Sequence, residues 1–443
     1  MLKRDRFAYP TLIFIFLSCF SFVALGLERH ETYGLMLTFF AMYFSYFWIV
    51  RDQRISFREI AWIGIAARLI LFFSLPVLSD DFYRFIWDGR LIDLGIDPFA
   101  KLPADLVEDA AMRQSNELFK LLNSPNYHSI YPPLNQFIFY LASAITDSYL
   151  ISVNIIRFVV LSLEILGLYL LAGSPGLKDR KYLALYFLNP LLILEGVGNV
   201  HFEVIVAFFL LLFIYLFHKS RYFLSGTALG LAIATKLLPL IFLPYIFLRL
   251  WWKKGLFITL VAILVALLTF SPFLFFWDTD GLFQSIKLYF NKFEFNASIY
   301  FLAREMGYWQ KGYNQIAQIG PLMAILSFLT ILIVSLWTSY RKVKMSEALM
   351  WILTAYLLFA TTVHPWYILP LILLGTLSGY YYPFVWSAAI LVTYTGYTLK
   401  GYQLSSIWVL FEYFLVIGTM IFEIWKNYET NKSAHHTVDN DAV

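Results

Sequence analysis

The stretch Leu78-Ser79-Asp80-Asp81-Phe82-Tyr83-Arg84-Phe85-Ile86-Trp87-Asp88-Gly89-Arg90 directly follows a long apolar run. It holds three carboxylates and two arginines among aromatic residues. Ionisable groups are costly at membrane depth, so charge gathered at the end of an apolar segment marks a candidate functional site. We therefore predict that one carboxylate of the pair Asp80 and Asp81 does chemistry at a membrane surface.

The rest of the chain has the composition of an integral membrane protein. Of its 443 residues, 60% are hydrophobic and 14% are charged, whereas a soluble domain carries roughly 25% charge. The mean hydropathy is +0.68. A net charge of +4 does not favour nucleic acid as a partner. The single cysteine, Cys19, excludes an internal disulfide framework and a cysteine-based metal site, and we expect neither a metal nor a cofactor.

Apolar runs that approach the length of a membrane helix recur along the chain. We predict one all-α, polytopic domain over residues 1–430, with about 12 to 14 transmembrane helices, and a disordered polar tail over 431–443. The expected spans are 10–27, 33–50, 60–78, 150–172, 182–197, 201–218, 223–236, 238–250, 256–277, 316–338, 346–363, 365–379, 381–399 and 404–425. The short segments within 223–250 and 365–379 are candidates for broken or re-entrant helices.

Basic residues orient the spans, because Lys and Arg gather in cytoplasmic loops. They precede the first span and then recur at alternate span ends, which predicts cytoplasmic termini in a bacterial plasma (inner) membrane. Two large loops, about 79–149 and 278–315, then face the periplasm or exterior. The first loop is expected to carry a surface helix at 103–122 and a short helix at 134–146 that dips into the outer leaflet. If 131–147 crossed the membrane instead, every later loop would change sides.

Within this orientation, polar groups interrupt the apolar pattern at several outer turns. Ser79 and Asp80 have an alternative role as a plain helix cap. His201 and Glu203, two apart at a helix start, form either a ligand pair or a polar turn. Lys236 either snorkels or binds a lipid-linked phosphate.

Two further places complete the candidate site. Pro365 breaks a helix, and its neighbours His364, Trp366 and Tyr367 form either a binding wall or an interfacial aromatic belt. Arg304, in the second outer loop, is another candidate for binding phosphate. Asn296-Ala297-Ser298 matches a glycosylation sequon, a pattern that is common by chance.

Taken in order, these motifs resemble the GT-C superfamily of membrane glycosyltransferases, and within it the bacterial mannosyltransferases that use a polyprenyl-phosphate-linked hexose. The resemblance covers most of the chain. It rests on Ser79-Asp80-Asp81-Phe82-Tyr83-Arg84, Trp87-Asp88-Gly89-Arg90, Gly95-Ile96-Asp97-Pro98-Phe99, Ile130-Tyr131-Pro132-Pro133, Gly198-Asn199-Val200-His201-Phe202-Glu203, Ala234-Thr235-Lys236-Leu237-Leu238-Pro239, Phe295-Asn296-Ala297-Ser298-Ile299-Tyr300 and Val363-His364-Pro365-Trp366-Tyr367. Two spans precede the one that leads into the first outer loop, where many members have one.

The resemblance implies transfer of a hexose, with inversion, from a polyprenyl-phosphate donor to a glycan, glycolipid or protein acceptor on the outer face. The family indicates that this hexose is mannose. An acidic residue of the first outer loop is the base in that family, which points to Asp80, with Asp81 as its nearest rival. The residues then expected to bind donor phosphate or substrate are Arg84, Arg90, Tyr131, His201, Glu203, Lys236, Arg304, His364, Trp366 and Tyr367.

A transporter or lipid flippase is the alternative function for a chain with this many spans. Against it, the sequence has no inverted repeat, and its charges gather at the outer mouths rather than at mid-membrane. If the enzyme reading is correct, Asp80, Lys236 and His364 should meet in one outward pocket.

Overall fold

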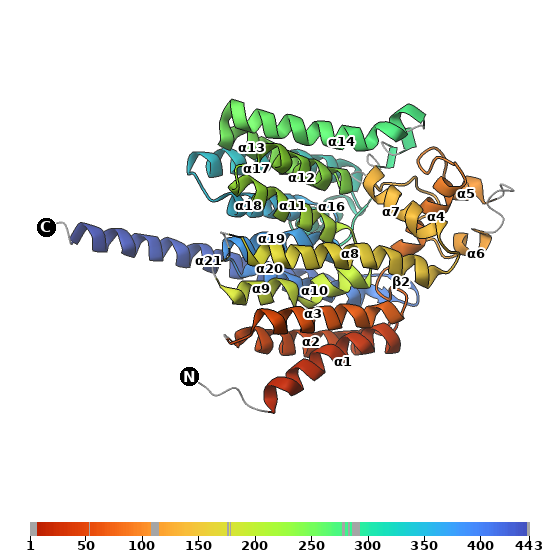
Figure 1. Ribbon diagram of the computed structural model, residues 1–443, viewed down its shortest axis with the longest axis horizontal. Coiled ribbons are helices and arrows are strands. Elements are labelled where there is room, and N and C mark those ends of the chain that lie inside the picture. Colours follow the sequence, from red (N-terminus) through yellow and green to blue (C-terminus); the bar gives the residue numbers. More distant parts are fainter. Residues whose placement is uncertain are drawn as a thin grey trace.

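The computed structural model describes residues 7–52, 54–107, 115–174, 177, 179–276, 280–281, 284–285 and 293–440. Helices dominate the described chain and run side by side as a bundle (Figure 1). The short helices α4 to α7 gather at one end of this bundle, whereas α1 begins and α21 ends toward the other end (Figure 1). The first outer loop therefore forms a cap on the bundle.

The helices of the bundle carry most of the apolar runs. They are α1 (Ala8–Gly26), α2 (Thr32–Arg51), α3 (Phe57–Ile70), α8 (Tyr149–Ala172), α9 (Arg180–Phe187), α10 (Pro190–Ile193), α11 (Glu203–His218), α12 (Tyr222–Thr235), α13 (Leu243–Leu250), α14 (Leu256–Phe276), α17 (Ile316–Tyr340), α18 (Met345–Phe359), α19 (Leu369–Ser378), α20 (Tyr382–Ala389) and α21 (Ser406–Asn440). The elements of the two loops predicted to face outward are α4 (Asp81–Asp93), α5 (Pro103–Leu106), α6 (Asn116–Phe119), α7 (Pro133–Ala144) and α16 (Ile299–Lys311).

By length and composition, six of the described helices could cross a membrane. A seventh span is possible if Pro190–Gly198 and Glu203–His218, which meet at 112°, form one broken crossing. Shorter apolar helices cover Tyr222–Thr235, Leu238–Leu250, Met345–Phe359 and Pro365–Ser378. The predicted class, an all-α polytopic membrane protein, is confirmed, and every predicted span contains helix.

Several predicted boundaries differ from the structure. The span predicted at 381–399 ends early, because the chain passes into a small hairpin in which Tyr397 pairs with Tyr402. Gly401 turns this hairpin with a φ of 114°, which few side chains tolerate. In place of one helix at 103–122 the structure has α5 and α6, with 108–114 outside the described residues. At the other end of the chain, α21 ends at Asn440, and the disordered tail over 431–443 stays a prediction.

Glycine lets two pairs of helices approach closely. A Cβ on Gly89 of α4 would lie 2.2 Å from the carbonyl oxygen of Phe139 in α7. The rings of Phe85 and Phe139 stack beside this contact at 4.6 Å. In the bundle, a Cβ on Gly230 of α12 would lie 2.6 Å from the carbonyl oxygen of Ala262 in α14. Small residues at such crossings are how membrane helices gain packing energy.

A buried ion pair joins α3 to α8. The guanidinium of Arg68 binds both carboxylate oxygens of Glu164, at 2.8 and 2.9 Å, and both side chains are almost fully buried. Arg68 also donates to the carbonyls of Gly64 and Phe187, each at 3.0 Å. Because the charge and the remaining donors are satisfied, the pair can persist within an apolar bundle.

Candidate functional site

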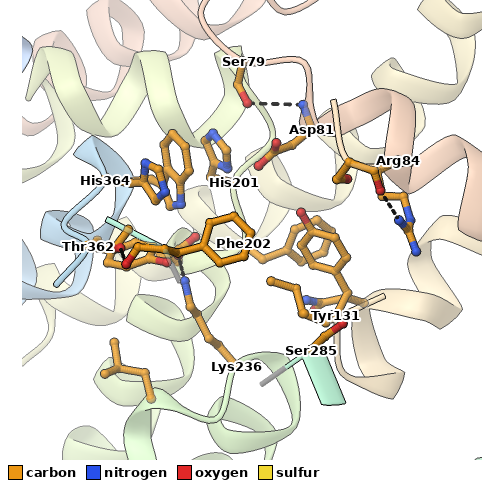
Figure 2. A pocket seen from close by; sticks show the side chains of 18 of the residues that line it. Ser79, Asp81, Arg84, Tyr131, His201, Phe202, Lys236, Ser285, Thr362 and His364 are labelled. Carbon is orange, nitrogen blue, oxygen red and sulfur yellow. Dashed lines mark hydrogen bonds and ion pairs between the residues drawn. The ribbon is translucent and has the colours of Figure 1, made fainter. Parts of the chain in front are cut away.

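A cavity of about 640 Å³ opens between the outer loop and the bundle. Its volume falls in the range typical of small-molecule sites. Most of the side chains predicted for the site line it, and several of them appear in Figure 2. The predicted residues on its wall are Asp80, Asp81, Arg84, Tyr131, His201, Glu203, Lys236, His364, Trp366 and Tyr367.

The carboxylate of Asp80 is held by an arginine from another part of the chain. Asp80 occupies the N-cap position of α4, yet its side chain makes no capping hydrogen bond. Instead, Nη2 of Arg29 donates to Oδ2 of Asp80 at 2.5 Å. The Oγ of Ser79 accepts a hydrogen bond from the backbone N–H of Asp81 at 3.3 Å. The carboxylate of Asp80 is therefore not a helix cap but half of an ion pair at the cavity wall.

The neighbouring Asp81 points into the same cavity (Figure 2). Its Oδ1 accepts a hydrogen bond from Nδ2 of Asn123 at 2.7 Å. Burial raises the pKa of Asp81, the bond from Asn123 offsets part of this rise, and the charge of Asp80 adds to it. Among the described residues, no cation forms an ion pair with Asp81, whereas Asp80 is paired with Arg29.

An ammonium group lies at the wall of the cavity. Nζ of Lys236, the residue that follows α12, pairs with Oε1 of Glu203 at the start of α11. It also lies 3.9 Å from the ring centroid of Tyr367. The side chain of Lys236 is 31% exposed, so its charge remains available to a ligand. In Figure 2, Lys236 reaches into the cavity from below His201 and His364.

Three stacked rings form the opposite wall. Trp366 lies between His201 and His364, with ring centroids 3.7 and 4.4 Å away and near-parallel planes. Because both faces of the indole are covered, a sugar cannot stack on Trp366. Burial, with the charge of Lys236, lowers the pKa of His364 to about 3, so this imidazole is neutral at physiological pH.

A strained turn places His201 and Glu203. Val200 has a φ of 57°, a conformation that a β-branched residue adopts only at a cost of about 1–3 kcal/mol. Oδ1 of Asn199 accepts from the backbone N–H of Leu78 at 3.3 Å, which ties this turn to the start of the acidic stretch. His201 then stacks on the indole, whereas Glu203 pairs with Lys236, so each has a partner of its own.

Arg84 fixes the wall of the cavity formed by 123–131. Its Nε donates to Oδ1 of Asp88 at 2.7 Å, and its Nη1 donates to the carbonyls of Ser124 and Tyr127. Asp88 also accepts a hydrogen bond from Ser129 at 2.5 Å. These bonds occupy most of the guanidinium, so Arg84 anchors the loop more than it offers charge to a ligand.

The structure does not bring Arg90 and Arg304 to the cavity wall. Arg90 donates to the hydroxyl of Ser115 and the carbonyl of Asp147, on the outside of the cap. Arg304 pairs with Glu294 at 3.5 Å and with Glu305 at 2.9 Å. Both arginines have carboxylate or carbonyl partners in the structure, and one of these, Glu305, directly follows Arg304 in the sequence.

Sequence reasoning missed several residues of the wall. Arg29 lies in the short link between α1 and α2, and its guanidinium carbon lies 4.4 Å from the ring centroid of Tyr397. Asn123 lies in a loop without a recognisable motif. Phe295 packs on His364, with centroids 4.4 Å apart. The next residue, Asn296, is fully buried and binds both carboxylate oxygens of Glu412, so the sequon is not an accessible glycosylation site.

Comparison with known families identifies the chain. The model described as alpha-(1→6)-mannopyranosyltransferase, N-terminal domain, matches residues 19–252, which is more than half of the sequence. The chain belongs to this family. A second model, mannosyltransferase (PIG-M), matches residues 197–308. No curated protein matches the chain.

Both matched families are membrane mannosyltransferases of the GT-C type, so the predicted resemblance is confirmed. The protein is a multi-pass membrane glycosyltransferase that transfers mannose. The alternative function, transport or lipid flipping, has no support from either family.

Proposed function

We propose that this mannosyltransferase takes mannose from a polyprenyl-phosphate donor and transfers it, with inversion, to an acceptor hydroxyl at the outer face of a bacterial plasma membrane. One observation carries the proposal: a carboxylate with a raised pKa and a lysine ammonium line a single cavity at the capped end of a membrane bundle. A base and a phosphate-binding cation are the groups that this reaction needs.

In this reaction, a carboxylate accepts the proton of the acceptor hydroxyl as its oxygen attacks the anomeric carbon. The bond from that carbon to the phosphate oxygen breaks on the opposite face, and the polyprenyl phosphate leaves with the electron pair. We assign the base to Asp81, because the carboxylate of Asp80 is engaged in an ion pair with Arg29, whereas Asp81 receives only a neutral donor and keeps one oxygen for the acceptor hydroxyl. No covalent intermediate is needed, so one carboxylate suffices.

Lys236 is the proposed ligand of the donor phosphate. Its ammonium is held in place by Glu203 and by the face of Tyr367, and a phosphate entering the cavity adds a second anionic partner. Charge on the leaving group grows in the transition state, so a preorganised cation lowers the barrier to its departure. Leu237, Leu238 and Ile241 line the cavity beside it and offer an apolar path for the lipid.

The stereochemistry fits the family description. An inverting enzyme that makes an alpha linkage requires a donor in which mannose is beta-linked to phosphate. We propose such a donor here, and an alpha-(1→6) linkage in the product by analogy with the matched family.

A donor panel tests the proposal. The purified protein, reconstituted in vesicles, is incubated with radiolabelled polyprenyl-phosphate mannose, polyprenyl-phosphate glucose or GDP-mannose, together with alkyl mannosides as acceptors. We expect transfer from the polyprenyl-phosphate mannose alone. Transfer from GDP-mannose at an equal rate would refute the lipid-linked donor.

A labelling experiment tests the orientation of the cap. Lys120 is exposed, so Lys120→Cys in a Cys19→Ser background places one reactive thiol on it. A membrane-impermeant maleimide should label this thiol in intact cells. Labelling only after the cells are opened would place the cap in the cytoplasm.

A further inference from the structure

Asp80 and Asp81 are adjacent in the sequence, but their partners come from distant segments. Arg29 reaches Asp80 from the link between α1 and α2, and Asn123 reaches Asp81 from the loop that follows α6. Each partner also lines the cavity. The two carboxylates are thereby distinguished: one is neutralised by a cation, and the other receives a neutral donor.

We propose that Asn123 is a positioning residue that orients the carboxylate of Asp81 for proton transfer, an inference that rests on the proposed function. A carboxylate accepts hydrogen bonds and donates none when it is ionised, so the amide nitrogen of Asn123 must face it. The 2.7 Å bond occupies Oδ1 and leaves Oδ2 for the acceptor hydroxyl. Rotation of the carboxylate about its own bond is then restricted.

The backbone next to Asn123 is itself held in place. Arg84, one turn after Asp81 on α4, donates to the carbonyl of Ser124 at 3.1 Å. The backbone N–H of Ala104 donates to the carbonyl of Pro125 at 3.0 Å. Helix α4 therefore carries both the base and the arginine that fixes the loop bearing its partner.

Other charges act on Asp81 and stay in place when Asn123 is changed. Asp80 and Glu203 raise the pKa of Asp81, and Arg29 lowers it. Three further groups interact with the charge of Asp81 electrostatically: Glu195 in the broken helix, Tyr131 in the fixed loop and Tyr397 of the hairpin. A change in pH dependence in an Asn123 variant can therefore be attributed to the lost hydrogen bond.

The test is the pH profile of kcat/KM for transfer from polyprenyl-phosphate mannose to an alkyl mannoside. In Asn123→Ala, the ionised base loses a donor, so its pKa rises and the acid limb should move up by about one pH unit. On the plateau above the limb, we expect kcat/KM to be about tenfold lower, because the carboxylate is no longer held in one orientation. Asn123→Asp should move the limb further up, because it places a second negative charge on Asp81. Asn116→Ala, an exposed asparagine of α6 away from the cavity, is the matched control and should leave the profile unchanged.

Three outcomes decide the matter. An upward shift of the acid limb in both Asn123 variants supports positioning. An unshifted limb overturns it, whether the rate is unchanged or uniformly lower, because a merely structural loss does not move the limb. Full transfer by Asp81→Asn would instead overturn the assignment of the base, and this result is independent of the Asn123 variants.

Discussion

The substitutions Asp80→Asn and Asp81→Asn, compared in one assay, separate the two carboxylates. General-base help contributes about 10² to 10⁴ in rate, so Asp81→Asn should lower kcat/KM by that factor. This corresponds to roughly 3 to 5 kcal/mol of transition-state stabilisation. Asn123 donates a hydrogen bond to Oδ1 of Asp81. In Asp81→Asn, the amide oxygen of the new side chain can accept the same hydrogen bond, so the side chain can keep its position.

The effect of Asp80→Asn should be far smaller. The side chains of Arg29 and Asp80 are 27% and 38% exposed, and ion pairs with this much solvent contribute about 0–1 kcal/mol. We therefore expect less than about a fivefold loss of kcat/KM. The amide can still accept a hydrogen bond from Arg29, so the start of α4 should remain in place.

The assay is transfer of radiolabelled mannose by purified variants in vesicles, at donor concentrations well below KM. A single symmetrical peak in size-exclusion chromatography shows that each variant is folded. A loss of 10² or more for Asp80→Asn, with less than tenfold for Asp81→Asn, would reverse the assignment and make Asp80 the base. Full activity of both variants would remove both residues from the chemistry.

Other predictions concern pH, the donor and the fold. The pKa of Asp81 is raised, and a base acts only when it is deprotonated. The acid limb of kcat/KM should therefore lie above the pKa of an ordinary aspartate, about 3.9. An acid limb at or below about pH 4 would contradict this prediction. Lys236→Gln should raise KM for the donor by about 10- to 100-fold, which corresponds to the loss of one charge-assisted hydrogen bond, and KM for the acceptor should change less. Equal donor KM values in the variant and the unchanged protein would refute a role of Lys236 in donor binding. Glu164→Ala leaves Arg68 buried without its counter-ion, so the free energy of unfolding should fall by about 3–5 kcal/mol. An unchanged thermal midpoint in detergent would contradict this and would show that water reaches Arg68. Gly89→Val should lower the yield of folded protein, because even a Cβ at this position meets α7, and a normal yield would mean that the two helices can separate.

The sequence is informative about this site where a residue breaks the rule of its surroundings. Charge at the mouth of an apolar run marked Asp80 and Asp81, and an outward lysine marked Lys236. Arg29 offered no such signal, because an arginine in a short polar link between spans is ordinary. Asn123 also gave no signal, because an asparagine in a polar loop is ordinary. Their roles arise from contacts with residues 51 and 42 positions away, which no local pattern encodes.

The predicted boundary of the span at 381–399 failed for a related reason. Apolar runs located the helices, because each must present a nonpolar surface to lipid or to the core. The run that ends near Tyr397 stays apolar while its backbone leaves the helix: Tyr397 lines the cavity, and Tyr394 is buried against Glu195. Arg304 has the reverse problem: its charge suggested phosphate, but Glu294 and Glu305 already neutralise it.

The composition of the cavity wall has a consequence for dissecting this enzyme. The matched mannopyranosyltransferase region ends at residue 252, yet Phe295, His364 and Tyr397 line the same cavity as the two aspartates. A chain cut at that limit keeps the base, the lysine and His201 but loses Trp366 and His364, the other two of the three stacked rings. The boundary is therefore one of sequence similarity and not of autonomous activity. Two co-expressed fragments divided there should be inactive singly and regain transfer only when they assemble with each other.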